Sequence, residues 1–102
     1  MMFGLNKETI EKINAVFQKH PEVEEVIIYG SRAKGNHRAG SDIDITLKGK
    51  YLDEKIRSTI SLEIDDLNTP YLFDISILEK INNPELLSHI KQYGRIFFKK
   101  QH

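Results

Sequence analysis

Aspartate and isoleucine alternate through residues 42–45, which read DIDI, near the middle of the chain. Successive side chains of a β-strand point to opposite faces of a sheet. The alternation therefore predicts a strand that buries two isoleucines in a core and places Asp42 and Asp44 together on the opposite face. Two carboxylates on one rigid face are suitable ligands for Mg²⁺, which prefers oxygen atoms and often completes its coordination shell with substrate phosphates.

A Gly-Ser pair follows an apolar segment and is separated from Asp42 by ten residues. Gly30 has no Cβ to obstruct the approach of a phosphate group to the backbone. Ser31 can contact a phosphate through its hydroxyl and begin a short helix whose free N–H groups favour anions. Together with the aspartates, the pair predicts a site for a nucleoside triphosphate and Mg²⁺. Four basic side chains lie between the two motifs, and we assign them no catalytic role: Arg32, Lys34, His37 and Arg38.

A third carboxylate comes from a later segment with the same alternation. Residues 71–78 predict a strand with an apolar face and with Asp74 on its polar face. If this strand lies beside the DIDI strand, Asp74 faces the same ions as Asp42 and Asp44. Three clustered carboxylates repel one another, and this raises their affinity for protons until a metal binds. We therefore predict two Mg²⁺ ions, with Asp74 as a general base as well as a metal ligand.

Helical and strand patterns alternate along the chain without a linker or an internal repeat. The predicted helices cover about 6–20, 52–67 and 84–93, and the predicted strands cover 23–29, 42–47, 71–78 and 95–98. Asn6 is the predicted N-cap of the first helix, and Gly94 ends the last one. Phe97 and Phe98 are expected to pack in the core or at a sheet edge. The alternation predicts a single α/β domain over residues 1–102.

Composition excludes several classes of protein. Lys and Arg number 15, and Asp and Glu also number 15, so the net charge gives no sign of nucleic-acid binding. Cysteine is absent, which excludes disulfides and thiolate metal sites. Neither an export segment nor an apolar run of about 20 residues that could span a membrane is visible. We therefore expect a cytoplasmic protein that does not enter a membrane.

Each motif alone has a simpler explanation. A Gly-Ser pair after a strand is often only a turn, and Asp-x-Asp on a strand is often a solvated sheet face. The combination of Ser31 with three aspartates favours a metal-dependent site instead. Three histidines show no metal-ligand spacing and are predicted to be surface residues: His20, His89 and His102.

Through these motifs the chain resembles the minimal nucleotidyltransferase (MNT) family of the polymerase-β-like nucleotidyltransferase superfamily, of the MntA-like antitoxin type. The family pattern is Gly-Ser, ten residues, Asp-x-Asp and an aspartate on a later strand, which Gly30, Ser31, Asp42, Asp44 and Asp74 match. The resemblance implies a polymerase-β-like fold, a small mixed sheet with flanking helices. It also implies that the three aspartates are catalytic and bind two Mg²⁺ ions, and that Gly30, Ser31, Asp42 and Asp44 bind the nucleotide.

The resemblance also indicates a reaction and a partner. MNT proteins transfer a nucleoside monophosphate from a triphosphate to a hydroxyl and release pyrophosphate. Larger relatives carry a second, helical domain, and we expect a separately encoded helical HEPN-domain protein to take its place. The chain is then expected to move AMP from ATP to a hydroxyl of this partner, as its antitoxin. Two alternatives stay open: a non-catalytic nucleotide-binding module that neutralises its partner by docking, and an enzyme that modifies a small molecule.

Overall fold

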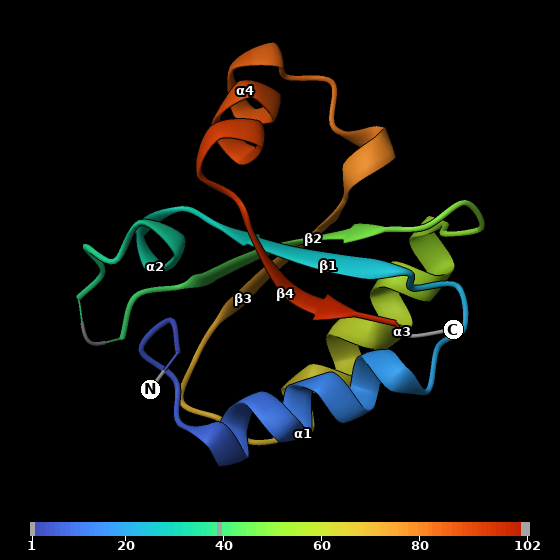
Figure 1. Cartoon of the computed structure of the whole chain (residues 1–102). Coiled ribbons are helices and arrows are strands. Elements are labelled where there is room, and N and C mark those ends of the chain that lie inside the picture. Colours follow the sequence, from blue (N-terminus) through green and yellow to red (C-terminus); the bar gives the residue numbers. More distant parts are fainter. Residues whose placement is uncertain (1, 39, 101–102) are drawn as a thin grey trace.

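The computed structural model describes residues 2–38 and 40–100, which form a four-stranded sheet with helices on both faces (Figure 1). The helices are α1 (Lys7–Gln18), α2 (Ser31–Lys34), α3 (Glu54–Asp65) and α4 (Pro84–Tyr93), with a short 3₁₀ helix, η1 (Leu78–Lys80). The strands are β1 (Glu25–Tyr29), β2 (Ile43–Lys48), β3 (Phe73–Ile77) and β4 (Arg95–Lys99). None of the described helices has the length and apolar character needed to cross a membrane.

The strand order in the sheet is β3-β2-β1-β4. β1 runs antiparallel to β2 and to β4, whereas β2 and β3 are parallel. Parallel neighbours need a long crossover connection, and α3 provides it between β2 and β3. The expected small mixed sheet with flanking helices is therefore confirmed.

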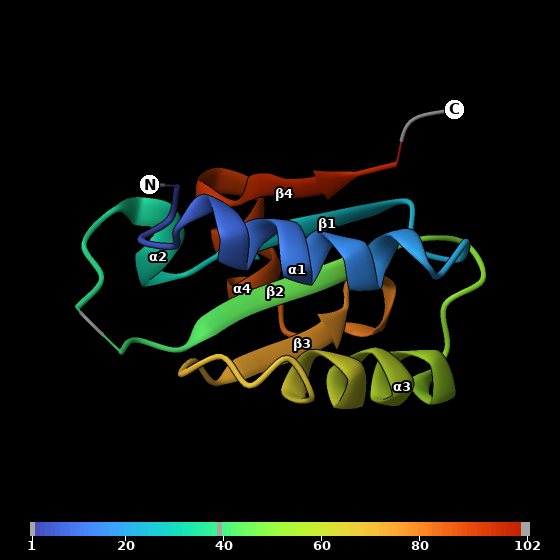
Figure 2. The ribbon, with the colours of Figure 1, turned by 90° about the horizontal axis from the view of Figure 1, so that it is seen from below.

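The core lies between the sheet and two helices. α1 and α3 cover one face of the sheet, and α4 lies over the other face (Figures 1 and 2). Ile43 and Ile45, the isoleucines of the DIDI motif, are fully buried on the α1 and α3 side, as predicted. Burial of one such side chain stabilises a fold by about 1.5–3 kcal/mol. The rest of this buried layer consists mainly of Ile13, Phe17, Val26, Ile28, Leu47, Ile60 and Ile64.

β2 begins at Ile43, so Asp42 lies one residue before the strand, contrary to the predicted range 42–47. The last pair between β1 and β2 joins Tyr29 to Asp44, and the chain then leaves the sheet at Gly30, where φ is 81°. Ile43 pairs only with Phe73 of β3, and Asp42 pairs with neither neighbouring strand. Asp42 is exposed in the loop that leads into β2.

The remaining boundaries differ from the predicted ones by a few residues. α3 begins at Glu54 because the side chain of Asp53 caps it, accepting a hydrogen bond of 2.8 Å from the backbone N–H of Ile56. Asn6 caps α1 as predicted, but α1 ends at Gln18. β1 and β3 are shorter than predicted, and η1 was not predicted. α4 covers the predicted residues 84–93.

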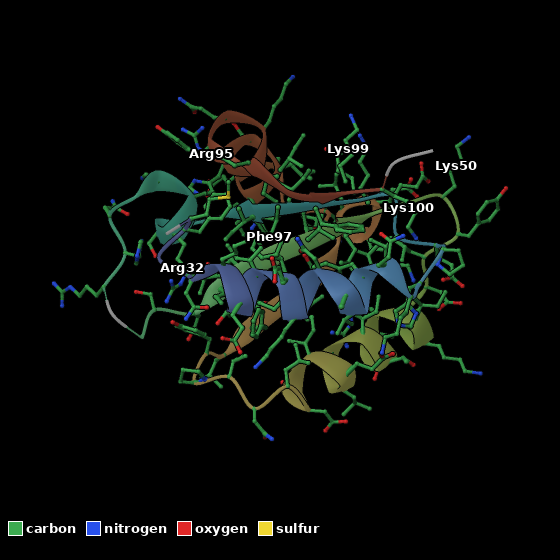
Figure 3. The ribbon with its side chains drawn as sticks, turned by 60° about the horizontal axis from the view of Figure 1, so that its bottom comes forward. Arg32, Lys50, Arg95, Phe97, Lys99 and Lys100 are labelled. Carbon is green, nitrogen blue, oxygen red and sulfur yellow. The ribbon has the colours of Figure 1, made fainter. Side chains whose placement is uncertain are left out.

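An irregularity in β4 explains how two consecutive phenylalanines enter the core. Val26 pairs with Phe98 and Ile27 pairs with Ile96, so Phe97 is an extra residue in β4. Such a bulge interrupts the strict alternation of side chains. Both rings consequently pack against Phe17, with centroids 6.3 Å away for Phe97 and 5.6 Å away for Phe98. The expected packing of this pair is confirmed, and Phe97 lies between β4 and α1 (Figure 3).

Candidate active site

Tyr29, Asp44 and Asp74 form a row across three adjacent strands. Asp44 is the register partner of Tyr29 on β1 and of Asp74 on β3. The isoleucines that follow in β2 and β3, Ile45 and Ile75, are buried on the side of α1 and α3. Because side chains alternate along a strand, the row with the aspartates faces the side of α4. The sheet register thus brings together two of the three predicted carboxylates.

The electrostatics of Asp44 indicate that the other two carboxylates both act on it. Partial burial raises the pKa of the Asp44 carboxyl above its ordinary value, and the negative charges of Asp74 and Asp42 raise it further. His89 acts in the opposite direction. Burial also raises the pKa of Tyr29, and Asp74 and Asp44 add to that increase. The structure therefore brings Asp42 to the same electrostatic cluster, although it lies outside β2.

Three carboxylates form a donor set with the chemistry that Mg²⁺ prefers. Burial is the main cause of the raised pKa of Asp44, and repulsion by Asp74 and Asp42 adds to it; a bound cation would relieve that repulsion. In the described residues, however, no group of three or more His, Cys, Asp or Glu side chains is gathered closely enough to hold a metal ion. Asp42 and Asp74 are exposed at the surface, whereas Asp44 is partly buried.

Gly30, the first residue of the phosphate motif, lies against the Asp44 carboxylate. Its φ of 81° is in the left-handed region that favours glycine. A Cβ at this position would also lie 2.5 Å from Oδ2 of Asp44, well inside van der Waals contact. The sequence suggested only that Gly30 leaves room for a phosphate. The structure adds that this glycine leaves room for the Asp44 carboxylate itself, and that α2 begins directly after it at Ser31.

The four basic residues after Ser31 do not share one environment. Lys34 and Arg38 are exposed and His37 is partly buried. Arg32 is only 3% exposed, so it is not a surface cation of the loop. It lies where α2 meets the N-terminal turn (Figure 3).

Aromatic rings from α4 adjoin the carboxylate row, and the sequence analysis did not identify them. The His89 ring lies 6.4 Å from the Tyr29 ring and 5.2 Å from the Tyr93 ring, measured between centroids. The Lys34 ammonium lies 4.8 Å from the centroid of Tyr93. His89 and Tyr93 are four residues apart and so share a helix face, but only the tertiary structure shows that this face meets α2 and β1. A cavity of about 310 Å³ beside them is lined by Ala33, Lys34, Gln92, Tyr93, Gly94 and Arg95.

The three histidines predicted to be surface residues have different outcomes. His89 is partly buried and packs edge-on against Tyr29, so that prediction is wrong for His89. His20 is also partly buried, because its Nε2 and Oε1 of Glu63 are 2.7 Å apart in a hydrogen bond. His102 lies outside the described residues.

Without Mg²⁺, Asp44→Asn should stabilise the fold at neutral pH. The raised pKa means that the folded state of the wild type binds more protons than the unfolded state, so its stability falls as pH rises from about 4 through the raised pKa. The amide of the Asp44→Asn chain does not titrate, so this chain lacks that loss of stability. Because Asp44 is partly exposed, the gain should stay below about 1 kcal/mol, a few degrees of melting temperature at most. Thermal unfolding in EDTA between pH 3 and 8 measures it, and a gain that persists at pH 3 would contradict the explanation.

Comparison with known proteins assigns the chain to a family. The polymerase beta nucleotidyltransferase family model matches residues 11–102. The chain belongs to this family. It is therefore a nucleotidyltransferase, and the predicted resemblance to the superfamily is confirmed. A search of curated proteins finds no significant match to this nucleotidyltransferase.

Solved structures show the same fold at low sequence identity. A toxin–antitoxin complex with AMP-PNP matches with a TM-score of 0.70 and 21% identity, over 95% of this chain and 76% of the other. A complex of the tri-AMPylated HEPN toxin of Shewanella oneidensis with its MNT antitoxin matches with a TM-score of 0.68 and 17% identity, over 95% and 75%. A nucleotidyltransferase structure from Sulfolobus solfataricus matches with a TM-score of 0.54 and 22% identity, over 95% and 92%.

Proposed function

We propose that this nucleotidyltransferase moves AMP from ATP, with Mg²⁺, to a hydroxyl of a separately encoded HEPN-domain protein and thereby acts as its antitoxin. We propose that it does so as a single domain in the cytoplasm. Family membership supplies the reaction class. Similarity of fold to complexes that contain AMP-PNP in one case and an AMPylated HEPN toxin in another supports the nucleotide and the kind of partner.

The observation that carries this proposal is the register that places Asp44 beside Asp74, with Gly30 against the Asp44 carboxylate. In the proposed site, Asp42, Asp44 and Asp74 hold two Mg²⁺ ions. When bound, Mg²⁺ supplies Lewis acidity that polarises the α-phosphate and stabilises charge on the departing pyrophosphate. Gly30 lets the triphosphate approach the backbone, and the Ser31 hydroxyl donates a hydrogen bond to a phosphate oxygen.

The transfer itself is a displacement at the α-phosphorus of ATP. Asp74 accepts the proton of the acceptor hydroxyl, and the hydroxyl oxygen forms a bond to the α-phosphorus. The bond between the α-phosphorus and the oxygen that bridges to the β-phosphorus breaks, and pyrophosphate leaves. Asp74 is exposed, so a hydroxyl on another protein can reach it. An acceptor held in line with the leaving oxygen gains the rate advantage of a positioned reactant.

Co-expression with a helical HEPN-domain protein encoded beside this chain tests the proposal. Intact-mass spectrometry should show partner molecules that are heavier by one or more adenylyl groups, with the modification on a hydroxyl side chain, such as that of tyrosine. Co-expression with the Asp44→Asn chain should leave the partner mass unchanged. A partner that is neutralised by the Asp44→Asn chain without any modification would establish docking instead. Rapid modification of a small molecule by the isolated chain would favour the third alternative.

A further inference from the structure

Arg32 is a buried charged residue to which the proposed reaction gives no role. Its side chain is 3% exposed, and burial of a guanidinium is costly unless its N–H groups are hydrogen-bonded. Its Nε and Nη2 donate to the carbonyl oxygen of Ser41 at 3.1 and 2.9 Å, and its Nη1 donates to the carbonyl oxygen of Phe3 at 2.9 Å. The guanidinium carbon also lies 4.9 Å from the centroid of the Tyr71 ring.

These contacts join the segments that carry the candidate site. Arg32 directly follows Ser31, whereas Ser41 directly precedes Asp42. One side chain therefore connects the first residue of the ten-residue loop to its last residue. Tyr71 belongs to the segment that leads into β3, three residues before Asp74. The phosphate motif and the two acidic segments thus all meet at one guanidinium.

The N-terminal turn is shaped around the same guanidinium. Phe3 has a φ of 56°, which is rare for a bulky residue and indicates a conformation imposed by its surroundings. Its carbonyl oxygen is an acceptor for Arg32. Gly4, with a φ of 74°, leaves space for the His37 ring, which a Cβ there would meet first, and for Nη1 of Arg32, which would lie 2.9 Å from that Cβ. The hydrogen bond from Arg32 is one of the surrounding contacts that hold Phe3 in this conformation.

We propose that Arg32 is a positioning residue that fixes the phosphate motif at Gly30 and Ser31 relative to Asp42 and Asp74. The loop that it closes contains two glycines, whose conformational freedom would otherwise let Asp42 move relative to Ser31. Only a planar guanidinium can donate to two separate carbonyl oxygens while its face lies against an aromatic ring, so lysine does not replace arginine here. A site held in this way is organised before the nucleotide binds, and ordering the loop then costs the nucleotide less free energy.

Nucleotide affinity tests this role independently of the acceptor. Titration calorimetry with Mg²⁺ and a non-hydrolysable ATP analogue should show at least about tenfold weaker binding for Arg32→Lys and Arg32→Ala, because the nucleotide must then order the loop itself. Methylguanidinium at millimolar concentration should restore part of the affinity of Arg32→Ala, and methylammonium should not. Arg38→Met, which alters an exposed arginine of the same loop, should bind as the wild type does.

Two further variants separate positioning from general loss of stability. Phe98→Leu alters a ring that packs on Phe17, and it should lower the melting temperature without weakening the nucleotide. Tyr71→Leu keeps Arg32 but removes the ring beneath it, and it should weaken nucleotide binding by a few-fold. This variant keeps the test decisive if both Arg32 variants fail to fold. Nucleotide affinity equal to that of the wild type in Arg32→Lys would overturn the positioning role of Arg32. If both Arg32 variants fail to fold, unchanged nucleotide affinity in Tyr71→Leu would overturn it. The inference rests on the proposed nucleotide site, and a wild-type chain that binds no triphosphate would refute that site itself.

Discussion

Asp44→Asn is expected to lower nucleotide transfer by at least about a hundredfold, because residues that merely support a metal ligand already contribute about 10- to 100-fold. Asp44 is central in the carboxylate cluster, since it is the register partner of Asp74 and also interacts with the charge of Asp42. The amide keeps the shape of the side chain, and the buried neighbours Ile43 and Ile45 hold the strand in place. The loss should therefore appear in activity and not in the fold.

Transfer of labelled nucleotide to the partner, with circular dichroism as a measure of folding, checks this expectation. Asp42→Asn and Asp74→Asn should reduce transfer in the same direction. Asp65→Asn is a suitable control, because Asp65 is an exposed aspartate at the end of α3 and has no place in the proposed site. Full transfer by the Asp44→Asn chain would exclude the assignment of this carboxylate as a metal ligand.

Gly30→Ala should be the second most damaging change to nucleotide transfer, although it adds only one methyl group. The added Cβ would lie 2.5 Å from Oδ2 of Asp44, so the carboxylate must move. Both Mg²⁺ and triphosphate binding should weaken, and transfer should fall by about a hundredfold, the usual consequence of a shift of about 1 Å. The sequence suggested only that Gly30 leaves room for a phosphate, and the contact with Asp44 adds an effect on the carboxylates.

Gly35→Ala provides the matched control for this prediction. Gly35 has a similar φ of 82°, although its ψ is 6° where that of Gly30 is −156°, and a Cβ there meets nothing within 4 Å. Both variants place alanine at a positive φ, at a cost of about 1–3 kcal/mol, and the conformation of Gly30 is one that almost only glycine adopts. Only Gly30→Ala adds the clash with Asp44. Ser31→Ala should weaken triphosphate binding but not Mg²⁺ binding, through the loss of one hydrogen bond to a charged acceptor, about 1.5 to 3 kcal/mol. Equal transfer by the Gly30 and Gly35 variants would show that contact with Asp44 is unimportant.

Much of the fold could be predicted because it depends on local periodicity. The alternation of polar and apolar residues correctly identified the buried face of β2 and the polar face of β3, since a strand repeats every two residues. The α4 boundaries were predicted correctly because Pro84 suits the first turn of a helix and because Gly94 lies where a Cβ would meet the carbonyl oxygen of Ile90. Predictions failed where a partner strand decides the outcome, as at Asp42, which lies beyond the last β1 pair.

The sequence by itself determined which residues have side chains suited to the proposed chemistry. It also determined that Asp44 and Asp74 each lie on the polar face of a strand. Only the tertiary structure decided that β2 and β3 are parallel neighbours in a register that places these two carboxylates together. It also decided that Arg32 is buried and that His89 lies against Tyr29. The physical reason is that periodicity reflects the geometry of one segment, whereas register, burial and ring contacts depend on how segments far apart in the chain pack against one another.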